Sequence, residues 1–102
     1  MLVWAGENQG SVRVDRWPDA PRAFKTIAIH THNFEGIVRI EGTIEEEPTD
    51  DDWFEITTEE FERPLLRESY IQNRIHQCRD RTIWMRVIIE TQFGRVDRVL
   101  VL

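Results

Sequence analysis

Hydrophobic and polar residues alternate along most of the chain with a period of two, which is typical of half-buried β-strands. The segments SVRVD at 11–15 and AFKTIAIHTH at 23–32 both follow this pattern. A third segment, GIVRIEGTIEE at 36–46, places three apolar side chains on one face: Val38, Ile40 and Ile44. We expect this face to lie in the core, because one face of an antiparallel strand packs inward while the other meets solvent.

Proline and glycine mark the breaks between these strands. Pro18 and Pro21 predict a turn or an edge crossing at 16–22. The segment NFEG at 33–36 predicts a short hairpin-like link, since Gly36 is free to adopt a positive φ. In the same way TQFG at 91–94, with Gly94 as its turn residue, predicts a turn between the apolar segments TIWMRVIIE at 82–90 and RVDRVLVL at 95–102.

The middle of the chain is harder to assign. DWFEI at 52–56 predicts a short strand, whereas Thr57 and Glu60 match a capping box, and Pro64 would end such a helix after about one turn. Residues 57–68 are therefore interpreted as a long connection, with room for one helical turn. SYIQNRIHQC at 69–78 fits either a helix or a strand, and the strand is favoured because another β-rich segment follows directly after residues 79–81.

Together these segments predict an all-β protein, an antiparallel β-sandwich of jelly-roll type with about seven to eight strands. A chain of 102 residues suits one domain spanning 1–102. For the strand at 82–90 both faces are apolar, so the core takes either Trp84 or the alternate face, formed by Met85, Val87 and Ile89.

Charge and cysteine content exclude several classes of protein. The 13 Lys and Arg residues against 19 Asp and Glu residues give a net charge of −6, which repels nucleic acid phosphates. No apolar stretch approaches the roughly 18 residues of a membrane-spanning helix, and the first ten residues lack a basic region typical of a secretion signal. We therefore expect neither a nucleic acid nor a membrane partner. The single cysteine, Cys78, cannot form an internal disulfide.

Motifs for catalysis are missing from the sequence. It contains no nucleophile elbow, no phosphate-binding glycine-rich loop and no HExxH zinc motif, so we expect no enzyme, no catalytic residues and no cofactor. His30 and His32 lie two apart and share a strand face, as paired metal ligands do. They are candidates for a metal site, and polar sheet residues are the favoured interpretation of both.

The sequence around these histidines, HTHNFEGIVRIEG, resembles the first motif of the cupin family, with Glu35 and Gly42 in the corresponding places. It departs from the motif by one residue, since only Asn33 and Phe34 separate the second histidine from the glutamate. The second cupin motif is absent. A small cupin-like metalloprotein is therefore the last of the alternatives.

Two further segments suggest binding. The acid-rich segment EEEPTDDD at 45–52 predicts an exposed loop, and its spacing lacks the alternating ligands of a calcium loop. Four tryptophans could line a platform for sugars, which makes a ligand- or glycan-binding β-sandwich the second alternative: Trp4, Trp17, Trp53 and Trp84.

Three segments of the sequence resemble those of a known group of proteins. THNFEGIVRIEGTIEEEPTDDDWFEI, RTIWMRVIIE and the closing GRVDRVLVL are similar to small β-sandwich proteins of tailed phages that infect marine bacteria and cyanobacteria. This resemblance covers about two thirds of the chain, from Thr31 to Leu102, and matches poorly between 57 and 80. It implies a non-catalytic structural or assembly protein of the virion, assembled in the host cytoplasm, whose partners are other virion proteins.

The end of the chain predicts self-association. RVDRVLVL is apolar on both faces, and such a strand is normally covered, which favours a homo-oligomer, either a dimer or a trimer. We expect the arginine-rich second half to meet the acids of 45–52 across this contact. The candidate interface residues are Trp84, Arg86, Val99, Leu100 and Leu102.

Overall fold

The computed structural model describes residues 2–6, 9–14, 25–62, 71–79 and 82–101. The turn predicted at 16–22, Pro64 and Leu102 lie outside these ranges. The described residues form six strands and one short 3-10 helix: β1 (Leu2–Trp4), β2 (Gln9–Arg13), β3 (Lys25–Thr43), η1 (Asp50–Asp52), β4 (Phe54–Phe61), β5 (Ile71–Cys78) and β6 (Trp84–Val101).

All pairings are antiparallel and join the six strands into one sheet. The long strands β3 and β6 lie side by side at its centre. The first half of β3 also pairs with β5 and its second half with β4, while β6 pairs first with β2 and then with β1. The antiparallel all-β class is confirmed. A division into two packed sheets with jelly-roll connections stays a prediction.

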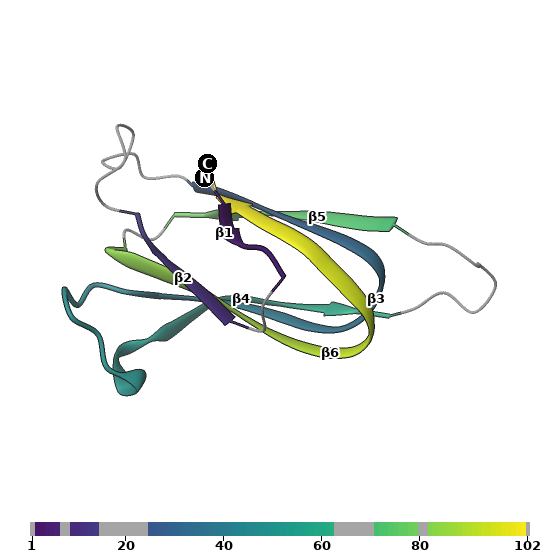
Figure 1. The fold of residues 1–102 in the computed structure, drawn as a ribbon. Coiled ribbons are helices and arrows are strands. Elements are labelled where there is room, and N and C mark those ends of the chain that lie inside the picture. The colour runs from purple at the N-terminus through teal and green to yellow at the C-terminus, as the bar shows by residue number, and fades with distance from the viewer. Residues whose placement is uncertain (1, 7–8, 15–24, 63–70, 80–81, 102) are drawn as a thin grey trace.

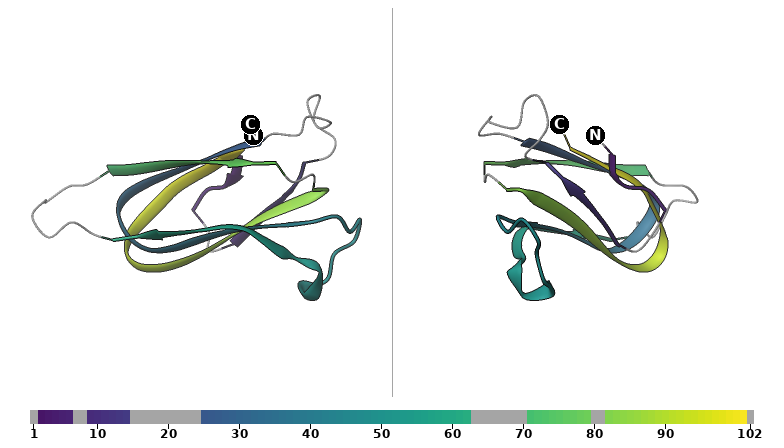
Figure 2. Two further views of the ribbon diagram at one scale, coloured as in Figure 1. Left: turned by 180° about the vertical axis from the view of Figure 1, so that it is seen from behind. Right: turned by 60° about the vertical axis from the view of Figure 1, so that its left-hand side comes forward.

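Both central strands bend strongly at the same end of the molecule, so that the two halves of the sheet face each other (Figures 1 and 2). β3 continues through residues 33–36 and β6 through residues 91–94. The hairpin-like link and the turn predicted there are therefore wrong, because the same residues make bends within strands. Positive φ values of 50° at Asn33 and 72° at Gly94 produce the change in direction.

The two bends are nested against one another. A Cβ atom on Gly94 would lie 2.0 Å from the carbonyl oxygen of Asn33, and one on Gly36 would lie 2.1 Å from that of Glu90. No side chain fits at either distance. Glycine is thus required here by the close approach of β3 to β6, in addition to its conformational freedom.

The bend in β3 also changes which residues face inward. Ile27, Ile29 and Thr31 are buried before the bend, whereas Phe34, Val38 and Ile40 are buried after it. The buried positions thus shift from odd to even numbers at residues 32 and 33, as an irregularity in the strand register requires. The inward faces of both halves meet in one hydrophobic cluster.

Most of the predicted core is confirmed, because Val38, Ile40, Met85, Val87 and Ile89 are all buried. The prediction for Ile44 is wrong, since its exposed fraction is 67%. β3 ends at Thr43, so the chain leaves the sheet just before Ile44 and the alternation no longer applies. Trp84 is half-buried on the opposite face of β6 from Met85.

The strand β4 replaces part of the predicted connection. Residues 57–61 continue the strand that begins at Phe54, and the β-branched Thr57 and Thr58 pair with Ile40 and Arg39 of β3. A helical turn at this point is therefore wrong. The capping box of the structure belongs instead to η1, where the backbone N–H of Thr49 donates to Asp52 at 2.7 Å.

Strands were correctly predicted on either side of this region. β2 confirms a strand at residues 11–13 of SVRVD, and β5 confirms the strand interpretation over the helix for residues 71–78 of SYIQNRIHQC. Asp15 and residues 69–70 lie outside the described residues. The described residues contain six strands, fewer than predicted, because β3 and β6 each take up two of the predicted segments.

Candidate binding surfaces

His30 and His32 lie on the outward face of β3, and both are half-exposed. In the register of the sheet His30 is opposite Arg98 and His32 is opposite Arg95 on β6. The residues opposite both histidines are therefore arginines, and their positive charge does not favour a metal cation on this face. Within the described ranges no three histidine, cysteine or acidic side chains are grouped closely enough to hold a metal ion.

The acidic segment between β3 and β4 projects at one end of the sheet, at the lower left in Figure 1, and contacts β2 and β6. Most of its residues are exposed, as predicted for a loop. Its contacts with the sheet come from a few residues that point back at β2 and β6. The salt bridge between Arg13 and Glu46, with a shortest N–O distance of 2.7 Å, ties the loop to β2.

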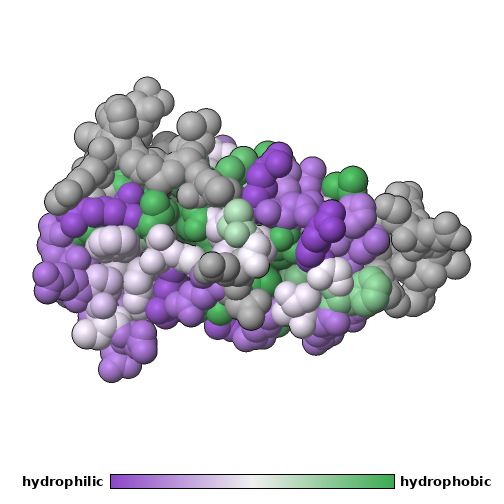
Figure 3. Space-filling view, viewed as in Figure 1, coloured by the Kyte–Doolittle hydropathy of each residue, from purple (hydrophilic) through white to green (hydrophobic). Residues whose placement is uncertain are grey.

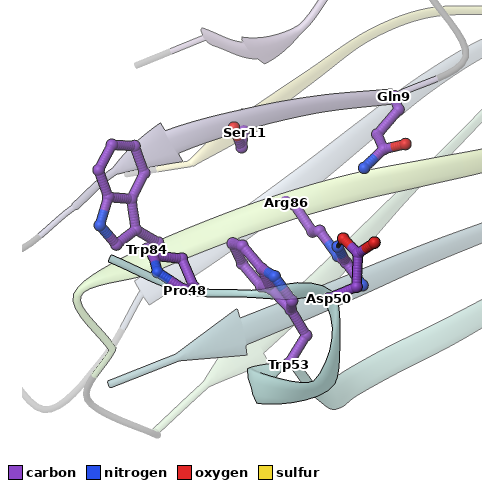
Figure 4. A pocket seen from close by; sticks show the side chains of 7 residues that line it. All are labelled: Gln9, Ser11, Pro48, Asp50, Trp53, Trp84 and Arg86. Carbon is purple, nitrogen blue, oxygen red and sulfur yellow. Dashed lines mark ion pairs between the residues drawn. The ribbon is translucent and has the colours of Figure 1, made fainter. Parts of the chain in front are cut away.

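Between this loop and the sheet lies a pocket of about 290 Å³, which we call the tryptophan pocket (Figure 4). Its residues come from three parts of the chain: β2, the loop and β6. The pocket is lined by Gln9, Ser11, Pro48, Asp50, Trp53, Trp84 and Arg86.

Each of the two tryptophans is held by polar contacts. The indole N–H of Trp84 donates to the carbonyl oxygen of Glu46 at 3.1 Å, and the guanidinium of Arg13 lies 5.9 Å from the ring centre. The guanidinium of Arg86 lies 4.4 Å from the ring centre of Trp53, a distance typical of a cation–π contact. These contacts orient both rings.

Arg86 connects the pocket to the sheet beneath it. Its Nε donates to Glu41 Oε1 at 2.7 Å, and the side chains of this pair are only 12% and 15% exposed. Its Nη1 also lies 3.9 Å from Asp50 Oδ1, at the exposed rim. The charge of Arg86 is thus matched by carboxylates of the same chain. Some of the contacts predicted between arginines and the 45–52 acids are accordingly made within one molecule.

A second surface is formed by β5 at the side of the sheet. Ile71 and Ile75 are 63% and 72% exposed, whereas Gln72, Arg74 and His76 on the other face of the strand are half-buried. This strand therefore turns its apolar side outward and its polar side inward, the reverse of the usual arrangement. Hydrophobic surface reaches the upper edge of the molecule in Figure 3, where β5 lies in Figure 1.

The inward polar face of β5 is compensated by β4. Arg74 Nη1 lies 3.3 Å from Glu59 Oε2, and its guanidinium lies 4.1 Å from the ring centre of Phe61. Phe61 in turn packs edge-on against Phe34 of the core, with ring centres 5.3 Å apart. Arg74 thereby links the strands β5 and β4 across the open side of the folded sheet.

The predicted interface residues lie in different places. Trp84 and Arg86 line the tryptophan pocket. Val99 is fully buried in the core of its own chain and offers no side-chain surface to a partner. Leu100 is half-buried and opposite Ala28 on the outward face, and Leu102 lies outside the described residues.

Sequence reasoning missed Gln9, Ser11, Pro48 and Asp50 as pocket residues, and it missed the exposure of Ile71 and Ile75. The register of β2 on β6, which places Ser11 opposite Arg86, depends on contacts far apart in the sequence. A signal for β5 was present, since its two isoleucines share a face with Asn73 and Gln77, but alternation alone does not say which face is inward.

The described residues form an antiparallel β fold with two candidate binding surfaces, the tryptophan pocket and the exposed face of β5. Comparisons with protein-family models, with curated protein sequences and with solved structures found no match. The described residues include no helix able to cross a membrane.

Proposed function

We propose that the protein is a non-catalytic structural or assembly module that pairs with a second copy of itself through β5. The observation that carries the proposal is the outward exposure of Ile71 and Ile75 on this strand. A role in the particle of a tailed phage, among other virion proteins, follows from the resemblance in the sequence and forms part of the proposal.

The position of β5 supports pairing with another strand. Within the described residues it pairs with β3 along one side, and no described strand pairs along its other side. Half of the backbone N–H and C=O groups of such a strand point away from the sheet and can bind another strand. An inward-pointing charge often protects edges of this kind, but Arg74 already has Glu59 and Phe61 as partners.

The sequence of β5 is complementary to itself in an antiparallel arrangement. A two-fold axis at Asn73 places Ile71 of one copy opposite Ile75 of the other, so that the exposed isoleucines pack against each other. On the opposite face it places Gln72 beside Arg74, with no like charges across the axis. Each cross-strand apolar pair contributes about 0.2–1 kcal/mol, so the contact combines modest side-chain energy with backbone hydrogen bonds.

Cysteine cross-linking tests the proposed two-fold axis at Asn73. Residues opposite each other in antiparallel strands have Cα atoms about 4.5–5.5 Å apart, a distance that a disulfide spans. We expect Asn73→Cys to form a covalent dimer on mild oxidation, whereas Gln77→Cys on the same face, four residues from the axis, should not. The native Cys78 is buried and does not compete.

Sedimentation velocity across micromolar concentrations tests whether the exposed isoleucines of β5 form the contact between two copies. Ile71→Lys combined with Ile75→Lys should shift the protein to a monomer, because like charges then face each other across the axis. Ile44→Lys is the matched control, since Ile44 is also exposed but lies outside β5. A wild-type protein that is monomeric throughout, or a double variant that associates as wild type does, would refute the proposal.

A further inference from the structure

We propose that the tryptophan pocket binds one ring of an uncharged sugar. This site lies on the opposite half of the sheet from β5, so the inference does not depend on self-association. Its walls come from β2, β6 and the loop that carries Pro48, Asp50 and Trp53.

The apolar groups of the pocket suit a sugar ring. One face of a pyranose consists largely of C–H groups, which pack on the flat surface of an indole, while its hydroxyls project around the edge. Trp53 and Trp84 supply such surfaces from two different elements, and Pro48 adds a third apolar group. The contacts of Arg86 with Trp53 and of Glu46 with Trp84 hold the rings in place before a ligand arrives, which lowers the cost of ordering them.

The polar groups of the pocket suit hydroxyls. Gln9 and Ser11 present an amide and a hydroxyl from β2, and both residues are exposed. Asp50 presents a carboxylate at the rim, and Arg86 presents a guanidinium from the floor. The lining thus combines four polar residues with three apolar ones, which suits a ligand that has both hydroxyls and an apolar face.

Electrostatics select against charged ligands. The guanidinium of Arg86 is matched by Glu41 and approached by Asp50, and the loop above it carries further acids, so an anionic sugar or a phosphate would be repelled. The same acids would attract a cationic ligand, but Arg13 and Arg86 already occupy the cation–π positions on the tryptophan rings. A neutral ligand meets neither obstacle.

Size limits the ligand to a single ring. The volume of about 290 Å³ lies just below the range of about 300–1,000 Å³ for small-molecule pockets. One sugar ring, at the end of a chain or within it, fits this volume, and the remaining rings of a longer glycan would extend into solvent. The expected affinity is accordingly weak, with a dissociation constant on the order of 1 mM.

The test is a titration of the ¹⁵N-labelled protein with the methyl glycosides of glucose, galactose, mannose and N-acetylglucosamine. At least one of them should shift the indole resonances of Trp53 and Trp84 in a saturable manner. Trp53→Ala should weaken this binding by roughly tenfold or more. Phe54→Ala is the matched control, because Phe54 is the adjacent aromatic residue, is 40% exposed and does not line the pocket.

A second variant shows whether weaker binding by Trp53→Ala is due only to a rearranged loop. Gln9→Ala removes a polar group from β2 without touching the aromatic walls and should weaken the same glycoside, with its spectrum otherwise unchanged. Three outcomes would overturn the proposal: no glycoside shifts the indole resonances, the shifts persist in Trp53→Ala, or inorganic phosphate or a proline-rich peptide binds the pocket where the glycosides do not.

Discussion

Gly94 and Gly6 both have positive φ values, 72° and 88°, but their surroundings differ. A Cβ atom on Gly6 would meet no atom within 4 Å, whereas one on Gly94 would clash with Asn33 and His32 backbone atoms. Comparing Gly6 with Gly94 distinguishes two reasons why a position requires glycine. One is the backbone conformation, which both positions share, and the other is the contact between β3 and β6, which only Gly94 makes.

We expect Gly94→Ala to lower the free energy of unfolding by about 3 kcal/mol, and Gly6→Ala by about 1 kcal/mol. The first figure includes backbone strain and displacement of β3, and the second includes strain alone. Urea denaturation of both variants measures the difference. Equal losses would show that the nested bends are not a tight contact.

Elements differ in how far the sequence predicts them. Alternation correctly predicted β2, β5 and the two halves of β3, because it depends only on neighbouring residues. It failed at 33–36 and 91–94, where asparagine and glycine suit a turn and a bend equally well, and only the partner strand decides between them. For the candidate site, too, the sequence predicts what depends on single residues and not what depends on distant strands. Trp53 and Trp84 were identified as binding candidates, while Gln9 and Ser11 join them through the register of distant strands.

The loop between β3 and β4 should loosen when its link to Trp84 is removed. Trp84→Phe keeps an aromatic ring but removes the N–H that donates to Glu46. We expect a loss of about 0.5–1.5 kcal/mol in the free energy of unfolding.

Hydrogen exchange locates this effect. Amides of residues 45–52 should exchange faster in Trp84→Phe, while those of β3 and β6 keep their protection. Unchanged exchange in the loop would mean that other contacts, such as the salt bridge of Arg13 with Glu46, are sufficient to hold it.

For the whole molecule, the central pairing joins distant parts of the chain. Ile27 is opposite Val101 and Thr43 is opposite Trp84, so the sheet can close only after long loops have been ordered. Local contacts contribute little, since the only helix in the described residues is the three-residue η1.

Refolding should therefore be slow for a chain of this length. We expect the main phase to take milliseconds to seconds, as for other proteins dominated by non-local β pairing. Stopped-flow tryptophan fluorescence measures this rate, and a main phase in microseconds would contradict the expectation.

The shift of buried positions in β3 makes the number of residues at the bend as important as their identity. Removing Asn33 would turn one half of the strand over, so that His30 and His32 would point into the core and Ile27 and Ile29 would point outward. Insertions in the exposed loop at 45–52 carry no such penalty. Divergent relatives of this chain should therefore vary in length at that loop and keep a constant count across the bend, even where few side chains remain the same.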